Sequence, residues 1–513
     1  MRLNSFPTLR LFTICAALLA VQFSVSGSQG DEPANAPPKV VDVPGDSYFD
    51  YGDEPMRYLE NDRVKLGLDL SLGGAVTYLE DKLNHSGNMI NSYDWGRQIQ
   101  LSYYSGPKPF IGPNGEQPSP SWAGLGWNPI QSGDCGGYRS RVLDFDKKSD
   151  SEAFLRARPM LWPNSGVPAE CLFECRYQLT DNGFTLDATI VNNRSDKTQY
   201  QGRSQETPAV YTNAPWYKLV SYLGDKPFEN APITVIVDKN DGKGWPWVNY
   251  YTPEYWSALV DENNYGLGVY QPFSGESSSG FHGGDEPKGK DLGDKSVATG
   301  YIAPREVTIL DWNIKRTYRA TFIVGSVDEI RETVYKLAKN DVMETPKWSF
   351  KNDRQNWSYE NAVDEGYPIV DSLKILLESG RQAVAKSPVT FWKTSNASTL
   401  NIDASFETND ESTDEEQTIT IRLIPVSPAD SVDYLAWSEG SKNAASERVE
   451  KEKKYPRLNN VTVDATVKFD GRRRVVSLDL SDVNDYEGAM KRVDIIFPNI
   501  DGKATVYSVG FDK

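Results

Sequence analysis

The chain has 513 residues and carries 55 basic against 72 acidic side chains, so its formal net charge is −17. This acidic balance argues against nucleic acid as a partner, because an acidic surface repels phosphate. Two histidines are too few for a three-histidine zinc centre, and a content of 38% hydrophobic and 12% aromatic residues excludes a disordered chain.

The N-terminus has the three parts of a signal peptide. Arg2 and Arg10 supply positive charge, residues 11–25 form an apolar run, and small residues around 24–28 offer cleavage sites. We predict a signal peptide over residues 1–28 and a secreted or periplasmic protein, with an uncleaved anchor as the alternative. No later run reaches the about 18 apolar residues of a membrane helix, so no membrane span is expected after signal removal.

Residues 29–45 are rich in proline and polar side chains, which predicts a linker. From residue 46 the hydrophobic pattern has a period of two, with turn residues between the runs, so we predict an all-β domain with few helices over residues 46–343. The predicted strands are 64–79, broken at Gly73-Gly74, then 184–192, 232–238, 255–262, 265–273 and 317–325.

One segment at the end of this domain has the period of a helix. Ser326 and Glu329 have the spacing of a capping box. The apolar residues that follow at helical spacing are Val327, Ile330, Val334 and Leu337. We therefore predict a helix that closes the first domain, with a boundary at about 341–347.

Residues 344–513 predict a second β domain, because seven further runs alternate to the C-terminus. The acidic stretch 409–416 joins two of these runs. Its carboxylates lack the spacing of a calcium loop, so we interpret it as a solvated loop. No cofactor or metal ligand is predicted, and a structural calcium ion is left open.

The cysteines that follow the signal segment are Cys135, Cys171 and Cys175. Cys171 and Cys175 lie in a predicted strand, where four residues span about 13 Å, which exceeds the reach of a disulfide. A disulfide would therefore join Cys135 to one of the other two. Three buried thiols are the equally favoured alternative, because free cysteine packs as a small hydrophobic residue.

Candidate functional residues gather in loops, since regular strands leave function to the segments between them. Residues 91–104 combine aromatic rings with planar polar groups, as sugar binding requires. The predicted substrate-binding residues of this cluster are Asp94, Trp95, Arg97 and Gln100. The alternative is a structural Asp–Arg pair under packed rings.

The segment 120–139 is a glycine-rich stretch that carries tryptophans, which suggests a loop close to a ligand. Its predicted substrate-binding residues are Trp127, Gln131 and Asp134. A core loop filled by tryptophan is the alternative.

Glu206 lies in a third expected loop, 203–217, among aromatic and amide groups. We predict it as a general acid or base, with Tyr104 or His282 as the second catalytic group. His282 belongs to a fourth expected loop, 275–290, which is rich in Gly and Ser and is interpreted as a lid or a disordered segment.

The order of motifs in residues 50–340 resembles the galactose mutarotase-like supersandwich family. A strand enters Gly73-Gly74, Asp81-Lys82 follows, and Gly96-Arg97 comes next. The resemblance implies a large antiparallel supersandwich and a sugar-contacting role for Arg97. The aldose epimerases of this family use a catalytic histidine, and neither His85 nor His282 stands in the corresponding motif.

The second domain resembles carbohydrate-binding jelly rolls. The residues that carry this resemblance are Trp348-Ser-Phe, Trp357, Phe469-Asp-Gly-Arg, Tyr486-Glu-Gly and Val506-Tyr-Ser-Val-Gly-Phe511. The resemblance implies a β-sandwich that binds carbohydrate; a sandwich that only supports the first domain is the alternative.

Together these patterns predict a secreted protein that binds and processes an oligo- or polysaccharide, as a lyase or a hydrolase. The partner is carbohydrate, and the oligomeric state is left open. A non-catalytic carbohydrate-binding or cell-surface adhesion protein is the alternative. The sequence also lacks a GxSxG elbow, an HExxH helix and a GxxxxGK[ST] loop, which leaves serine-hydrolase, zincin and kinase-type chemistry without support.

Overall fold

The computed structural model describes residues 39–85, 87–238, 248–282, 298–339, 345–409, 416–431 and 457–513. The predicted signal peptide lies outside these ranges, and so does the predicted domain boundary at 343/344, which stays a prediction. Residues 38–513 form one compact unit. Among the described residues, antiparallel strands dominate and α1 is the α-helix, which confirms the all-β class with few helices.

The first sheet contains ten of the described strands, in the order β1-β2-β3-β4-β11-β18-β17-β14, with β5 attached to β4 and β8 attached to β5. Its strands are β1 Met56–Glu60, β2 Val64–Asp69, β3 Ala75–Asp81, β4 Ile99–Ser102, β5 Pro129–Ile130, β8 Met160–Leu161, β11 Arg203–Thr212, β14 Val248–Tyr251, β17 Glu276–His282 and β18 Thr299–Thr308. The break between β2 and β3 contains the short 3-10 helix Leu70–Leu72 and Gly73, whose φ of 61° suits glycine, as the Gly-Gly pair predicted.

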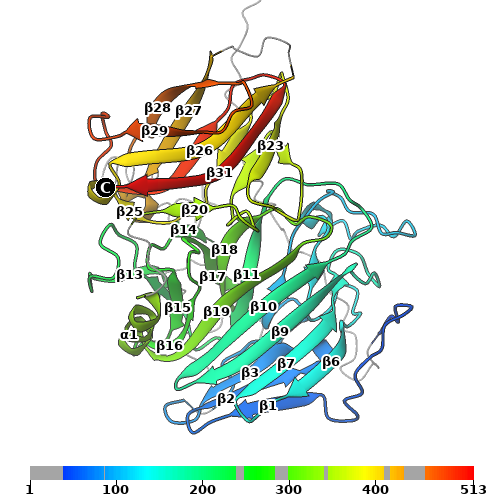
Figure 1. The fold of residues 1–513 in the computed structure, drawn as a ribbon. Coiled ribbons are helices and arrows are strands. Elements are labelled where there is room, and N and C mark those ends of the chain that lie inside the picture. The colour runs from blue at the N-terminus through cyan, green and yellow to red at the C-terminus, as the bar shows by residue number, and fades with distance from the viewer. Residues whose placement is uncertain are drawn as a thin grey trace, which may run out of the picture. The chain divides into compact units, whose positions relative to one another are not determined.

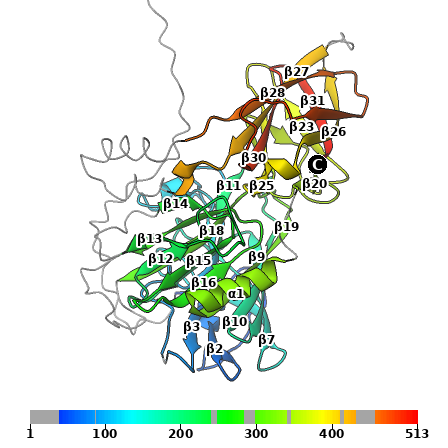
Figure 2. The ribbon, with the colours of Figure 1, turned by 90° about the vertical axis from the view of Figure 1, so that its left-hand side faces the viewer.

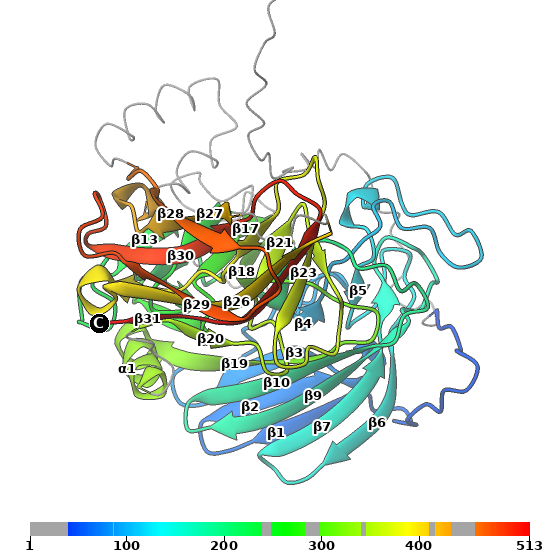
Figure 3. The ribbon, with the colours of Figure 1, turned by 45° about the horizontal axis from the view of Figure 1, so that its top comes forward.

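The second sheet contains nine of the described strands, in the order β13-β12-β15-β16-β19-β10-β9-β7-β6. Its strands are β6 Arg141–Lys147, β7 Glu152–Arg158, β9 Cys171–Thr180, β10 Gly183–Asn192, β12 Lys218–Ser221, β13 Thr234–Asp238, β15 Trp256–Val260, β16 Tyr265–Tyr270 and β19 Lys315–Ser326. Figure 1 shows β19, β10, β9 and β7 side by side in this sheet, and Figure 3 shows β1 and β2 lying against them.

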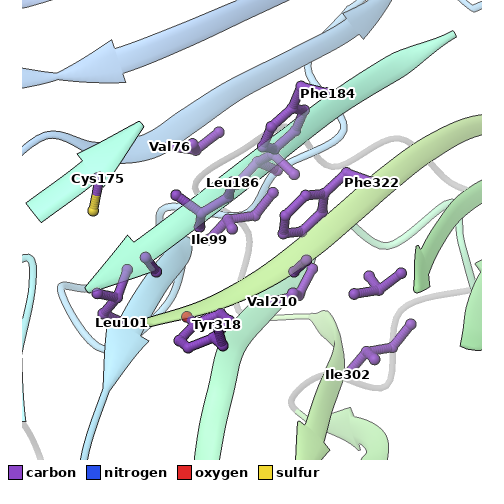
Figure 4. Packing of buried hydrophobic residues seen from close by; sticks show 14 of the residues in the cluster. Val76, Ile99, Leu101, Cys175, Phe184, Leu186, Val210, Ile302, Tyr318 and Phe322 are labelled. Atoms are coloured by element: carbon purple, nitrogen blue, oxygen red, sulfur yellow. The ribbon is translucent and has the colours of Figure 1, made fainter. Parts of the chain in front are cut away.

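The core of this part of the chain lies between the two sheets. Every second residue of the central strands points inward, since side chains alternate between the two faces of a strand. Figure 4 shows Ile99, Leu101 and Val210 from the first sheet facing Leu186 and Phe322 from the second. All five belong to one cluster of buried residues, so the two sheets form a sandwich.

The helix α1, Val327–Ala338, follows β19 directly and packs on the second sheet, beside β16 (Figure 2). Ile330 and Val334 are buried against Val260 and Ile323 of that sheet. The predicted capping box is confirmed. Leu337, expected on the apolar face, is instead exposed, and Ala338 is buried in its place.

Loss of the helix cap is expected to destabilise the protein modestly. The Ser326 side chain accepts a hydrogen bond from the Glu329 amide, and the Glu329 carboxylate accepts one from the Ser326 amide. Ser326→Ala should lower the free energy of unfolding by about 1 kcal/mol, because an N-terminal amide loses its acceptor. Urea unfolding measures this loss. Ser326→Thr, which keeps the hydroxyl, is the control, and equal stability of both variants would contradict the role of the cap.

Two smaller antiparallel sheets follow, in the orders β22-β23-β31-β26-β29 and β21-β24-β30-β27-β28. Their strands are β20 Lys347–Ser349, β21 Ser358–Glu360, β22 Val363–Asp364, β23 Leu373–Leu377, β24 Val384–Lys386, β25 Trp392–Lys393, β26 Thr399–Thr408, β27 Glu416–Pro425, β28 Val461–Lys468, β29 Arg474–Asp479, β30 Ala489–Ile496 and β31 Gly502–Asp512. Their inner faces share one apolar cluster, so this part is also a sandwich. The predicted tryptophans Trp348 and Trp357 are buried within it.

A buried polar network joins loops of both parts of the chain. Arg354 donates two hydrogen bonds to Asp364, each of 2.6 Å, and a further one to Asp311. Gln199 donates to both carboxylates, at 2.8 Å and 2.7 Å. A buried charge is stable only when it is paired and hydrogen-bonded. The segments that contain Gln199, Asp311 and residues 354–364 therefore depend on one another for their stability.

Two segments expected to be loops contain strands. Residues 203–212 form β11 and residues 276–282 form β17, so the expected loops at 203–217 and 275–290 are partly wrong. Residues 283–290, the rest of the fourth cluster, lie outside the described residues. The thiols of Cys135, Cys171 and Cys175 are free, as in the second of the two alternatives for the cysteines, although Cys135 is only half-buried.

Candidate active site

Glu206 lies near the middle of β11, in the interior of the first sheet. It is paired in register with Ser102 of β4 on one side and with Arg305 of β18 on the other. The register shifts just after Glu206, where Pro208 lacks an amide hydrogen for the ladder. The side chain of Gln205 points into the interior, whereas the Glu206 carboxylate is 13% exposed.

Two tyrosine hydroxyls and one guanidinium surround the Glu206 carboxylate. The Tyr104 hydroxyl donates to Oε2 at 2.7 Å, and the Tyr301 hydroxyl donates to Oε1. Nη1 of Arg305 lies 3.8 Å from Oε1. Tyr104 lies two residues after the end of β4, while Tyr301 and Arg305 lie four residues apart on β18. Three neighbouring strands therefore bring these side chains together, which makes the cluster rigid.

The two tyrosines are neutral proton donors at neutral pH. Burial, and then the negative charge of Glu206, raise the pKa values of Tyr104 and Tyr301 well above the ordinary value for tyrosine. Tyr104 is only half-buried, whereas Tyr301 has no exposed surface. Tyr104 is therefore the one of the two that a ligand can reach.

Arg305 remains cationic. Burial opposes its charge, but the neighbouring Tyr301 and Glu206 outweigh this effect and raise its pKa. Its Nε donates to the Ser204 hydroxyl at 2.7 Å, which orients the guanidinium along the sheet. The arrangement thus combines a carboxylate, an accessible phenol and a fixed positive charge, which are the groups that proton transfer next to an anionic substrate requires.

Asp94 and Arg97, both predicted from sequence, lie at the edge of this cluster. The ring of Tyr211 is 4.9 Å from that of Tyr301, and the pKa of Tyr211 is raised by burial, then by Glu206, Tyr104 and Asp94. Asp94 forms an ion pair with Arg97 at 3.2 Å. The Arg97 guanidinium also lies 4.7 Å from the ring centre of Tyr93.

The other predicted substrate-binding residues hold loops together. Gln100 is 1% exposed; it accepts hydrogen bonds from Ser132 and donates to the Trp95 carbonyl at 3.3 Å. The ring of Trp95 is half-buried and lies 5.3 Å from the Arg139 guanidinium. Substrate contact by Trp95 and Gln100 stays a prediction, and we do not include them in the proposed site.

Trp127, Gln131 and Asp134 lie in the packed interior, where at most 2% of each residue is exposed. Asp134 accepts three backbone hydrogen bonds, from Gly136, Tyr138 and Gly166. Side chains so enclosed organise the loop. Substrate contact by Trp127, Gln131 and Asp134 stays a prediction, and the proposed site does not include them.

Of the two histidines, the side chain of His85 belongs to the described part of the chain. The backbone of His282 pairs with Thr299 at the end of β17, and its side chain lies outside the described residues. The proposed role of His282 therefore stays a prediction. The ring of His85 packs edge-on against Trp216, with ring centres 4.9 Å apart.

The sequence patterns missed Tyr301, Arg305 and Tyr211. Tyr301 and Arg305 are nearly one hundred residues from Glu206 in the sequence, and only the pairing of β11 with β18 brings them together. The available signal was the spacing of Tyr301 and Arg305, which puts both on one face of a strand.

Within the described part of the chain, no group of three or more His, Cys, Asp or Glu side chains is placed to hold a metal ion. No helix in that part is long and apolar enough to cross a membrane.

The chain matches no protein-family model and no curated protein sequence. Solved structures similar to about half of it are galactose mutarotase-like proteins. One from Lactobacillus casei ATCC 334 is 16% identical, with 52% of this chain and 99% of that chain covered and a TM-score of 0.34. A galactose mutarotase related enzyme from Lactobacillus acidophilus is 12% identical, with 53% and 97% covered and a TM-score of 0.34.

An α-galactosidase from Lactobacillus brevis is 7% identical, with 53% of this chain and 39% of that chain covered and a TM-score of 0.29. The galactose mutarotase-like proteins are the group that the motif order of residues 50–340 resembles.

Proposed function

We propose that this protein is a secreted glycan-active enzyme and that it cleaves an acidic oligo- or polysaccharide by β-elimination at Glu206. The observation that carries the proposal is the hydrogen-bonded cluster of Glu206, Tyr104 and Tyr301 beside Arg305. Secretion follows from the predicted signal peptide over residues 1–28.

In this proposal the Glu206 carboxylate takes the proton from the sugar carbon next to the uronate carboxylate. The electron pair of that C–H bond forms a carbon–carbon double bond, and the bond to the glycosidic oxygen breaks. Tyr104 gives its proton to the departing oxygen. Tyr104 then recovers a proton from Glu206 across their 2.7 Å hydrogen bond, so both groups return to their starting state.

Arg305 would bind the uronate carboxylate and stabilise the negative charge that develops on it as the proton leaves. Its distance of 3.8 Å from Glu206 puts a cation beside the base without a direct hydrogen bond to it. Arg97, which the sequence suggested as a sugar-contacting residue, is already paired with Asp94.

Hydrolysis is the less favoured chemistry. It needs two carboxylates facing one glycosidic bond, at about 5–10 Å from each other. The described groups in contact with Glu206 are two tyrosines and an arginine, and the carboxylate at the edge of the cluster, Asp94, is held in an ion pair with Arg97 at 3.2 Å. A single carboxylate beside a phenol and a guanidinium suits elimination.

Digestion of a glycan panel tests the proposed function. We expect uronate-containing polysaccharides to yield products with the ultraviolet absorbance of a conjugated double bond. New reducing ends without this absorbance would replace elimination by hydrolysis. If neither signal appeared on any acidic or neutral glycan, while binding was retained, the protein would be the non-catalytic alternative.

A further inference from the structure

Arg203, at the start of β11, is a half-buried cation next to the candidate active site. Its guanidinium lies 5.4 Å from the ring centre of Tyr104, the ring whose hydroxyl reaches Glu206. Only Nη1 bonds to protein: it donates to the carbonyls of Ser105, at 3.0 Å, and Leu125. Nε and Nη2 donate to no acceptor among the described residues.

Lys108 belongs to the same surface. It is exposed, and partial burial and then the charge of Arg203 lower its pKa, so the two cations lie near each other. Gly126 lies between them: a Cβ at this position would be 2.7 Å from the Ser105 carbonyl oxygen and 3.0 Å from Cγ of Lys108. Arg203 donates to the same Ser105 carbonyl. Arg203 therefore lies in one small region with Lys108 and Gly126, although it is far from both in the sequence.

No carboxylate balances this pair. Among the described residues, neither Arg203 nor Lys108 lies within 4.0 Å of an acidic side chain, although the chain has a net charge of −17. Two other enclosed arginines are paired with carboxylates: Arg331 with Glu254 at 2.9 Å, and Arg316 with Glu306 at 2.5 Å. Arg194, which is 1% exposed, instead donates to backbone carbonyls and to the Ser105 hydroxyl, so its donors are satisfied without an anion. Enclosing a guanidinium without a counter-ion costs free energy, which a bound anion would recover.

Arg203 keeps its charge at neutral pH. Burial lowers the pKa of Arg203 to about 10, and the nearby charge of Arg305 adds to this effect. With Arg305, the surface around Tyr104 carries three positive groups against the single carboxylate of Glu206. This local balance is opposite in sign to that of the whole chain.

We infer that Arg203 and Lys108 form a second anion-binding subsite, which holds an acidic substituent on the sugar next to the one at Glu206. The inference rests on the proposed function and deepens it: the substrate is a glycan with negative groups on neighbouring residues. The substituent is a carboxylate or a sulfate ester, because both are planar or tetrahedral oxyanions that a guanidinium and an ammonium bind.

Calorimetric titration of the Glu206→Gln protein, which should bind without turnover, tests the subsite. Oligogalacturonate supplies carboxylates alone, sulfated dextran supplies sulfates alone, and plain dextran is neutral. We expect added Lys108→Gln or Arg203→Gln to weaken binding of the matching anionic glycan roughly tenfold to a hundredfold, the equivalent of losing one charge-assisted hydrogen bond. The anionic glycan that binds and responds identifies the substituent.

Arg381→Gln removes one positive charge whose side chain is 68% exposed in the C-terminal sandwich and is the matched control; it should leave binding unchanged. Arg203 also braces two loop carbonyls, so its replacement can disturb folding. Among the described residues, the Lys108 side chain donates to no loop carbonyl. The Lys108→Gln variant therefore tests the subsite without disturbing these loops. Unchanged affinity of Lys108→Gln for both anionic glycans, or equal loss of affinity for plain dextran, would overturn the subsite.

The subsite and the proposed function fail in different ways. If the unmodified protein cleaves acidic glycans and Lys108→Gln cleaves them with the same KM, the function holds and the subsite is wrong. If no glycan is cleaved but anionic glycans bind in a manner that depends on Lys108 and Arg203, the subsite holds and the elimination at Glu206 is wrong.

Discussion

Glu206→Gln should lower kcat on the acidic glycan by about 10²–10⁴-fold, the usual contribution of a positioned general base. The amide keeps the size of the side chain and can still bond to one tyrosine, but it cannot accept a proton from carbon. We therefore expect glycan affinity and melting temperature to change little. Initial rates of ultraviolet absorbance, with binding measured separately by calorimetry, check both parts of this expectation.

Two further variants test whether the loss of activity in Glu206→Gln is specific to the candidate active site. Tyr104→Phe removes the proposed proton donor and should also reduce kcat, with the largest deficit on substrates whose leaving sugar is least acidic. Glu174→Gln is the matched control: Glu174 is 18% exposed and pairs with Arg156 at 3.1 Å and with Lys315 at 3.2 Å, away from the cluster. Full activity of Glu206→Gln would show that another residue is the base.

Arg354→Ala should be the most destabilising single change discussed for this protein. It leaves the buried carboxylates of Asp311 and Asp364 without their cation, and breaking a buried ion pair in this way costs about 3–5 kcal/mol. Chemical denaturation of the full chain measures the loss. Arg381→Ala is the control, because the Arg381 side chain is 68% exposed and its replacement should change stability by about 0.5 kcal/mol or less.

The pH dependence of this deficit identifies its cause. Burial opposes ionisation of Asp364, but the Arg354 guanidinium outweighs it and lowers the pKa of the carboxyl below its ordinary value of 3.8. The wild-type network therefore stabilises the fold at neutral pH, and this contribution is lost as pH falls below about 4. The difference between Arg354→Ala and wild type should shrink over the same range. A difference that stays constant from neutral to acidic pH would point to lost packing as the cause.

Local patterns accounted for much of the fold. The capping box at Ser326 and the apolar spacing after it predicted α1, because a helix start depends on hydrogen bonds within one turn. The alternation of 184–192 and 317–325 predicted β10 and β19, although burial alternates in only part of each strand, and residues 320–325 of β19 are all buried. The strand β11 was missed, since residues 203–212 contain Pro208 and carry polar side chains toward both faces.

The sequence by itself determined the all-β class, the helix, the acidic surface and the choice of Glu206 and Tyr104 as chemical candidates. Only the tertiary structure decided which side chains surround Glu206 and Tyr104. The pairing of β11 with β4 and β18 brought Tyr104, Tyr301 and Arg305 to Glu206, and close packing enclosed Trp127, whose loop position had suggested a sugar platform. The physical reason is range: caps and alternation act between near neighbours along the chain, whereas strand pairing and burial join residues about one hundred positions apart.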